Sequence, residues 1–149
     1  MLEKPELLAD YKIIHRQTVV WGDIDSMQHV NNTKYFYYCE TARIDFIRML
    51  FPHFDNGPIS DMQAGLALAE TSCRYKVPVT FPDTLYIGTA VSQIEENQFW
   101  LEHALYSEKL ELIAAKAKAL LVYYDFKKTK RLSLDSALMK KLETHRLSV

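Results

Sequence analysis

The chain has 149 residues, of which 48% are hydrophobic and 25% are charged, and its formal net charge is −1. This length and composition predict one globular domain with a sizeable core, and the near-zero charge argues against a nucleic-acid partner. No apolar run is long enough to span a membrane, and the first residues lack the basic and apolar regions of a signal peptide. Two isolated cysteines, Cys39 and Cys73, lack metal-ligand spacing and predict reduced thiols in a cytoplasmic protein. We expect no metal and no cofactor.

The first predicted element is a strand over Tyr11–Val20, which Gly22 ends. The longest signal is a helix over Asn32–Leu50, in which apolar residues recur every three or four positions. Few positions of this helix are left for water, so we expect it to be buried. Pro52 ends the helix, and His53–Ser60 is predicted to be a loop because it is rich in turn residues.

The second half of the chain consists mainly of strand signals. Alternating or β-compatible apolar runs predict four strands, at Gly65–Tyr75, Leu85–Ile94, Phe99–Tyr106 and Leu112–Phe126. An extended connector, Val77–Pro82, joins the first two of these strands. A short amphipathic helix is expected over Leu134–Leu147, capped by Ser133 or Asp135. Strands that follow one helix in a run indicate an α+β fold with an antiparallel sheet.

The stretch between the first strand and the long helix has no helical or strand period, and it is rich in polar side chains from Asp23 to Asn32. It lies between apolar runs, so its polar groups must find partners or do chemistry. Asn31 or Asn32 is a suitable N-cap, and the free N–H groups at a helix start favour an oxyanion. A carboxylate, an imidazole and a helix N-terminus together suit acyl transfer. The alternative is that Asp23 and Asp25 shape a turn and that His29 is a core histidine.

The pattern Asp23-x-Asp25-x-x-x-His29-Val30-Asn31-Asn32-x-x-Tyr35, followed by Glu40-Thr41-Ala42-Arg43, resembles the hotdog-fold acyl-CoA thioesterases. The likeness is greatest to their 4-hydroxybenzoyl-CoA thioesterase-like and long-chain acyl-CoA thioesterase branch. Tyr75-Lys76-Val77-Pro78 resembles a second landmark of the family, so the likeness covers about residues 11–128. It implies one hotdog domain over residues 1–149, in which an antiparallel five-stranded sheet wraps around a long central helix and a short C-terminal helix follows.

The resemblance also implies an acyl-CoA substrate and roles for particular residues. Asp25 would attack the thioester or activate water, His29 would assist it, and the backbone N–H of Asn32 would bind the oxyanion. Asp23 is expected to hold the loop. The residues expected to bind substrate are Met27 and Tyr35 beside the acyl group, and Arg74 and Lys76 at the coenzyme A phosphates.

Three alternatives remain open at this stage. The His29-Val30-Asn31-Asn32 run is also similar to acyl-ACP thioesterases, and some hotdog proteins bind acyl-CoA without catalysis. A hydratase or dehydratase is disfavoured, because those proteins have a different Asp-to-His spacing. At least a homodimer is expected, with a dimer of dimers as the larger assembly, because the apolar stripes of Leu85–Val91 and Ile113–Tyr123 would otherwise leave an outer sheet face uncovered.

Overall fold

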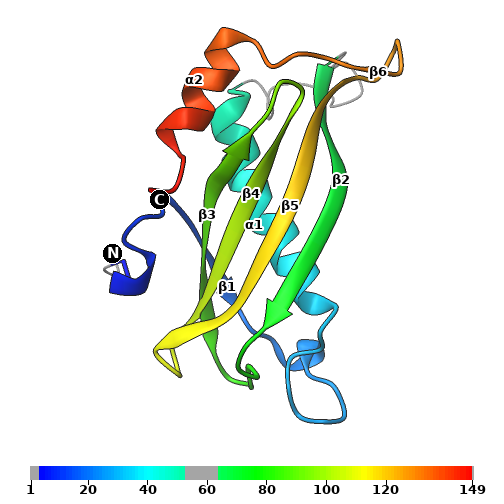
Figure 1. The fold of residues 1–149 in the computed structure, drawn as a ribbon. Coiled ribbons are helices and arrows are strands. Elements are labelled where there is room, and N and C mark those ends of the chain that lie inside the picture. The colour runs from blue at the N-terminus through cyan, green and yellow to red at the C-terminus, as the bar shows by residue number, and fades with distance from the viewer. Residues whose placement is uncertain (1–3, 53–63, 149) are drawn as a thin grey trace.

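The computed structural model describes residues 4–52 and 64–148. A curled antiparallel sheet wraps around one long helix, α1 (Lys34–Leu50), and a short helix, α2 (Ser136–Thr144), lies near the end of α1 (Figure 1). The strands are β1 (Ile13–Thr18), β2 (Ala64–Tyr75), β3 (Thr84–Ile94), β4 (Gln98–Ser107), β5 (Leu112–Asp125) and the two-residue β6 (Lys130–Arg131). The expected α+β hotdog architecture is therefore confirmed, including the assignment of the alanine-rich Leu112–Phe126 segment to a strand.

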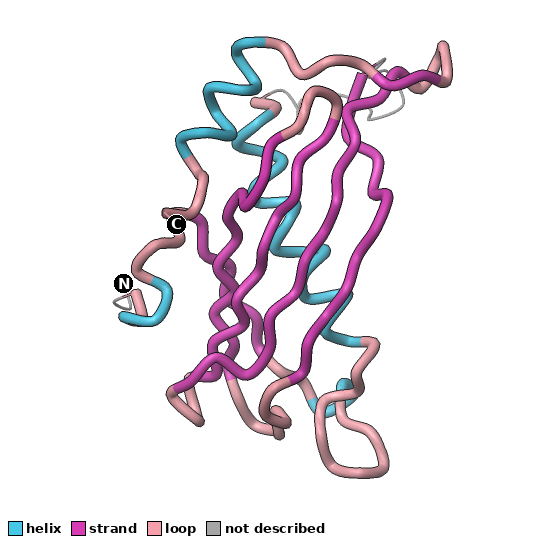
Figure 2. Tube along the Cα trace, viewed as in Figure 1, coloured by secondary structure: helices cyan, strands magenta, loops and turns pink. Residues whose placement is uncertain are grey.

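The order of strands in the sheet is β1-β3-β4-β5-β2, and β6 pairs with the far end of β5. The strand tubes in Figure 2 show β3, β4 and β5 running side by side as successive hairpins. β2 instead crosses to the far edge of the sheet, where it pairs with β5 alone. The short strand β6 was not expected from the sequence, because two residues carry no periodic signal.

The core lies between α1 and the inner face of the sheet. Phe46 and Ala42 of α1 are fully buried, and so are Leu85 and Ile87 of β3. The apolar stripe of β3 therefore faces the helix, and the alanines of β5 face it too, since Ala115 and Ala117 belong to the same core cluster. This corrects the expectation that these stripes leave an outer face uncovered.

The outer face is covered over only part of its width. Leu8 and Tyr11, from the N-terminal segment, pack on Ala90 and Ala104 of β3 and β4. Gly88 makes this packing possible, since a Cβ at that position would lie 2.5 Å from the Tyr11 ring. In Figure 1, which looks onto this face, no described helix crosses in front of β4, β5 and β2.

The ends of the helices differ slightly from the expected ones. α1 begins at Lys34, with Thr33 as its N-cap and no side-chain cap hydrogen bond, and ends at Leu50 as expected. α2 is shorter than expected, and Asp135, one of the two candidate caps, accepts from Leu138 N. The predicted loop over His53–Ser60 lies outside the described residues. No helix in the described ranges is long and apolar enough to cross a membrane.

Candidate functional site

The polar stretch before α1 folds into a closed turn. An isolated bridge pairs Ile24 with Val30, and the Asp25 N–H donates to the His29 carbonyl at 2.9 Å. Gln28 turns the chain with a φ of 64°, and its N–H donates to the Asp25 carbonyl. The turn is fixed to the body of the protein, because Val30 N donates to the carbonyl of Val79 at 2.8 Å. Asp25 and His29 are thus directly opposite each other, and such residues share one face.

The side chains of these two residues have unused hydrogen-bonding capacity. Asp25 Oδ1 accepts from Met27 N at 2.9 Å, and Oδ2 has no partner in the described part of the chain. No hydrogen bond to the His29 imidazole is found among the described residues either. Both side chains are partly exposed. A carboxylate with a free oxygen beside a free imidazole can accept a proton or attack a carbonyl carbon.

The start of α1 lies next to this turn. Asn31 Oδ1 accepts from the backbone N–H and the hydroxyl of Thr33, at 2.9 and 2.8 Å, and so holds the residue that directly precedes the helix. The expectation that Asn31 or Asn32 is the N-cap is wrong, because Thr33 occupies that position. Tyr75 donates its hydroxyl proton to the Asn32 carbonyl at 2.8 Å. Within residues 4–52 and 64–148, the Asn32 N–H meets no acceptor. An exposed N–H group at a helix start can stabilise a developing negative charge.

An open groove of about 430 Å³ brings these groups together. Its lining consists of Asp25, Met27, His29, Val30, Asn32, Tyr35, Tyr75, Lys76, Val77 and Pro78. All predicted site residues except Arg74 are therefore in one place. Tyr35 is only 3% exposed and lies at the base of the groove, whereas Met27 is 73% exposed and lies at its rim.

Arg74 lines a different groove, of about 570 Å³, on the outer face of the sheet. Lys76 lines both grooves. Arg74 and Lys76 therefore share the surface of this second groove, which meets the groove of the catalytic candidates at Lys76.

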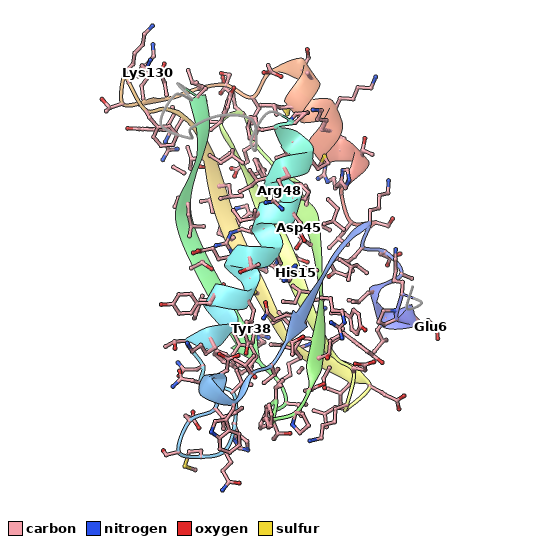
Figure 3. All side chains as sticks on the ribbon, turned by 180° about the vertical axis from the view of Figure 1, so that it is seen from behind. Glu6, His15, Tyr38, Asp45, Arg48 and Lys130 are labelled. Atoms are coloured by element: carbon pink, nitrogen blue, oxygen red, sulfur yellow. The ribbon has the colours of Figure 1, made fainter. Side chains whose placement is uncertain are left out.

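Two tyrosines that sequence reasoning did not select hold the site in shape. Tyr38 donates to Asp23 Oδ2 at 2.6 Å, and that oxygen also accepts from Val20 N at 3.2 Å, so Asp23 holds the loop as expected. Figure 3 shows Tyr38 at the end of α1 that meets the loop. Burial, with the Asp23 hydrogen bond second, raises the pKa of Tyr38, and burial raises that of Tyr75 to about 12. Both phenols therefore stay protonated and act as donors. The only sequence signal for Tyr75 was its place at the start of the Tyr75-Lys76-Val77-Pro78 landmark.

A second pair fastens α1 to the sheet edge. His15 Nδ1 of β1 lies 3.2 Å from Asp45 Oδ2 of α1, and the two residues face each other in Figure 3. The described residues contain no group of three or more His, Cys, Asp or Glu side chains that could hold a metal ion.

Comparison with known proteins assigns this arrangement to a family. A family model described as the thioesterase-like superfamily matches residues 19–142, which include the loop, α1 and the whole sheet from β2 to β6. The chain belongs to the thioesterase-like superfamily. A relative from Aquifex aeolicus (strain VF5), whose name marks it provisionally as an esterase, is 26% identical over 110 residues, covering 73% of this chain and 84% of the relative.

Solved structures share the fold of this thioesterase-like protein. A predicted thioesterase from Bacillus stearothermophilus matches with a TM-score of 0.81 at 14% identity, covering 92% of this chain and 98% of the other. A gentisyl-coenzyme A thioesterase, BH1999, matches with a TM-score of 0.73 at 22% identity, covering 87% and 98%. At these identities the likeness establishes the hotdog fold, and the chemistry must be argued from the groove itself.

Proposed function

We propose that this protein hydrolyses the thioester of an acyl-CoA to a free acid and coenzyme A. The observation that carries the proposal is that Asp25 Oδ2 and the Asn32 N–H, neither of which has a partner among the described residues, belong to residues that line the same groove. A thioester is an activated acyl donor, so a carboxylate and an oxyanion donor are sufficient for its hydrolysis. Membership of the thioesterase-like superfamily supports this reaction class.

Asp25 would act either as the general base for water or as the nucleophile on the carbonyl carbon. In both routes the carbonyl oxygen takes on negative charge at the Asn32 N–H, and the carbon–sulfur bond breaks when the tetrahedral intermediate collapses. The thiolate of coenzyme A leaves and takes a proton that comes from water. In the nucleophile route the acyl group is then held on Asp25 as an anhydride, and a water molecule hydrolyses it to the free acid and the Asp25 carboxylate. His29, opposite Asp25 in the turn, would orient the carboxylate or carry that proton.

The rest of the groove fits the two ends of such a substrate. Tyr35 at the base of the groove would contact the acyl group, and Met27 at the rim would contact it as it enters. Lys76, and Arg74 beyond it, would contact the phosphates of coenzyme A. The name of the gentisyl-coenzyme A relative supports a coenzyme A carrier, and it makes an aromatic acyl group a candidate alongside a fatty one.

We also infer a homodimer, and two such dimers could pair again. In the part of the chain that the structure describes, β2 pairs on one side only, and the unpaired edge of a strand is a template for another chain. Leu68 on β2 is 48% exposed and Tyr37 on α1 is 62% exposed, and both line a small pocket between these elements. The free thiols of Cys39 and Cys73 support a reducing compartment such as the cytoplasm.

A substrate panel tests the proposed function. Purified protein is assayed for release of free thiol from fatty and aromatic acyl-CoAs, and from the same acyl groups on an acyl carrier protein. Turnover of acyl-CoA well above that of the carrier-protein substrate is the expected result. Preference for the carrier protein would favour the acyl-ACP alternative. Binding of acyl-CoA without turnover of any substrate would identify a non-catalytic acyl-CoA-binding protein.

A further inference from the structure

The open part of the sheet's outer face carries a cluster of cations. The outer groove is lined by Arg74 of β2, by Lys116 and Lys118 of β5 and by Lys76 just after β2. Among its described lining residues, Glu102 of β4 is the single carboxylate. All four cationic residues are exposed. The N-terminal segment covers β3 and β4 elsewhere on this face but does not line this groove.

Register explains how the cations meet. Arg74 pairs with Lys116, and Ser72 pairs with Lys118, so the side chains on β2 and β5 project from the same face. The intervening residues, Cys73 and Ala117, belong to the core under α1. Residues 74 and 116 are far apart in sequence, so the cluster exists only because β2 crosses to the edge beside β5.

The placement of Arg74 opposite Lys116 does not stabilise the fold. Like charges at directly opposite positions of an antiparallel pair are destabilising. Glu102 Oε1 lies 3.9 Å from Lys118 Nζ and compensates that lysine, but Arg74 and Lys116 have no carboxylate within 4 Å in the described ranges. A bound anion would supply the missing charge, and phosphate groups suit a site built from arginine and lysine.

The position of Lys76 connects this groove to the catalytic candidates. The Lys76 N–H donates to the Ala114 carbonyl at 2.9 Å, which fixes the residue at the end of β5 that lies beside the loop. From Lys76 back to Ser72, a strand rises about 3.3 Å per residue, or about 13 Å in all. A ligand with its thioester at Asp25 can therefore pass Lys76 and place a phosphorylated end over β2 and β5.

We propose that the outer groove is the subsite for the phosphorylated nucleotide of the coenzyme A thioester, with Lys116 and Lys118 as binding residues alongside Arg74 and Lys76. This inference rests on the proposed function. The cluster spans only three adjacent strands, which lie about 4.8 Å apart. The width of the cluster is therefore comparable to the size of one nucleotide. A nucleotide therefore suits it better than the broad acidic surface of a carrier protein, for which a chain of net charge −1 offers no wide basic field.

Direct binding of adenosine 3′,5′-bisphosphate, measured by calorimetry, tests the subsite without any turnover. Wild-type protein should bind it, and the Lys116→Gln/Lys118→Gln double variant should bind it roughly ten- to thirtyfold more weakly, with the difference shrinking at high salt. The matched control is Lys127→Gln/Lys128→Gln, which removes two exposed lysines from the β5–β6 turn and should bind as wild type does. In the turnover assay, the β5 double variant should raise KM for acyl-CoA but not for an acyl-pantetheine thioester that lacks the nucleotide.

The outcomes separate this subsite from the proposed function. If the Asp25→Asn protein has lost turnover but binds the bisphosphate as tightly as wild type does, the subsite is supported. If the wild type binds the bisphosphate but hydrolyses no thioester, the subsite is supported and the proposed function is not. Equal binding by the wild type and the β5 double variant, or equal weakening in the control pair, would overturn the proposal. Absence of bisphosphate binding, together with binding of an apo-acyl carrier protein that the β5 double variant loses, would overturn it in favour of a carrier-protein surface.

Discussion

The backbone N–H of Asp25 and the carbonyl of His29 are joined by a 2.9 Å hydrogen bond, which closes the turn before α1. This bond places the carboxylate-bearing and imidazole-bearing residues directly opposite each other. It joins backbone atoms only, so it uses no hydrogen-bonding group of either side chain. The second oxygen of Asp25 has no partner in the described part of the chain, and Asp25 lines the groove. Backbone hydrogen bonds thus close the turn, and Asp25→Asn, which keeps the Oδ1 acceptor for Met27 N, should leave the loop largely intact.

The first prediction concerns Asp25→Asn, which preserves shape and removes the base. We expect kcat to fall about 100-fold or more with little change in KM, the range observed when a general base is lost. Steady-state release of free thiol measures it. Asp23→Asn is the matched control, since Asp23 accepts from Tyr38 and Val20 and should affect stability more than kcat. Near wild-type turnover by Asp25→Asn, combined with loss in Asp23→Asn, would show that the assignment is wrong.

The second prediction concerns Tyr75→Phe. This change keeps the ring, whose centroid lies 4.9 Å from that of Tyr35, and removes the hydrogen bond to the Asn32 carbonyl. We expect kcat to fall about fivefold and stability to fall by about 1 kcal/mol, because the peptide at the helix start loses one restraint. Tyr106→Phe, on β4 outside the groove, is the control. A change in KM alone would mean that Tyr75 binds substrate and does not position the oxyanion donor.

The third prediction uses His103, which is 1% exposed and lies 2.9 Å, through Nδ1, from Thr89 Oγ1. Burial, with nearby Arg43 second, lowers the pKa of His103 from 6.5 to about 3. Below pH 6.5, His103 therefore binds a proton in the unfolded chain but stays neutral in the folded protein. The contribution of neutral His103 to the free energy of unfolding is complete above pH 6.5 and is lost as the pH falls towards 3.

Urea unfolding at about pH 7 and about pH 5 measures this dependence. Wild-type protein should be less stable at the lower pH. His103→Gln should lose about 1–3 kcal/mol at neutral pH, because packing and the Thr89 hydrogen bond change, but should lose less on acidification than wild type does. An equal pH dependence in both proteins would assign the effect to other groups.

The fourth prediction concerns the edge of β2. If a second copy pairs along this edge, Leu68→Lys should shift the protein from dimer towards monomer, since a lysine on an edge strand opposes pairing. Light scattering at several protein concentrations measures the shift. Leu110→Lys, at a residue that is 38% exposed in the β4–β5 turn, is the control and should remain dimeric. A wild-type protein that is active and monomeric at the assay concentration would contradict the prediction.

Local patterns in the sequence were sufficient for the elements and for the loop. The spacing of apolar residues located α1 and the main strands, because helices and strands impose periods of 3.6 and 2 on any buried face. The pattern from Asp23 to Asn32 located the groove, because its groups lie close together in the chain and a tight turn keeps them together. Tyr75 was missed, because its contact with Asn32 spans 43 residues.

The sequence was insufficient to predict which face of the sheet is covered. Alternation of apolar and polar residues along a strand defines two faces but does not show which one packs against the helix. The stripe from Leu85 to Val91 was expected to leave an outer face uncovered, but its residues lie under α1. The spacing of Glu40 and Arg43, three residues apart on α1, favours an ion pair on the surface of the helix. Arg43 is instead 6% exposed, and its Nη1 has no partner in the described part of the chain.

The sequence by itself determined the order of the elements, the buried helix and the place of the polar turn before it, since each depends on residues near one another in the chain. Only the tertiary structure decided which faces are covered and which distant residues become neighbours. Arg74 meets Lys116 because β2 crosses the sheet to pair with β5. The register of such a pairing depends on the packing of the whole sheet against α1, and a short stretch of sequence does not contain it.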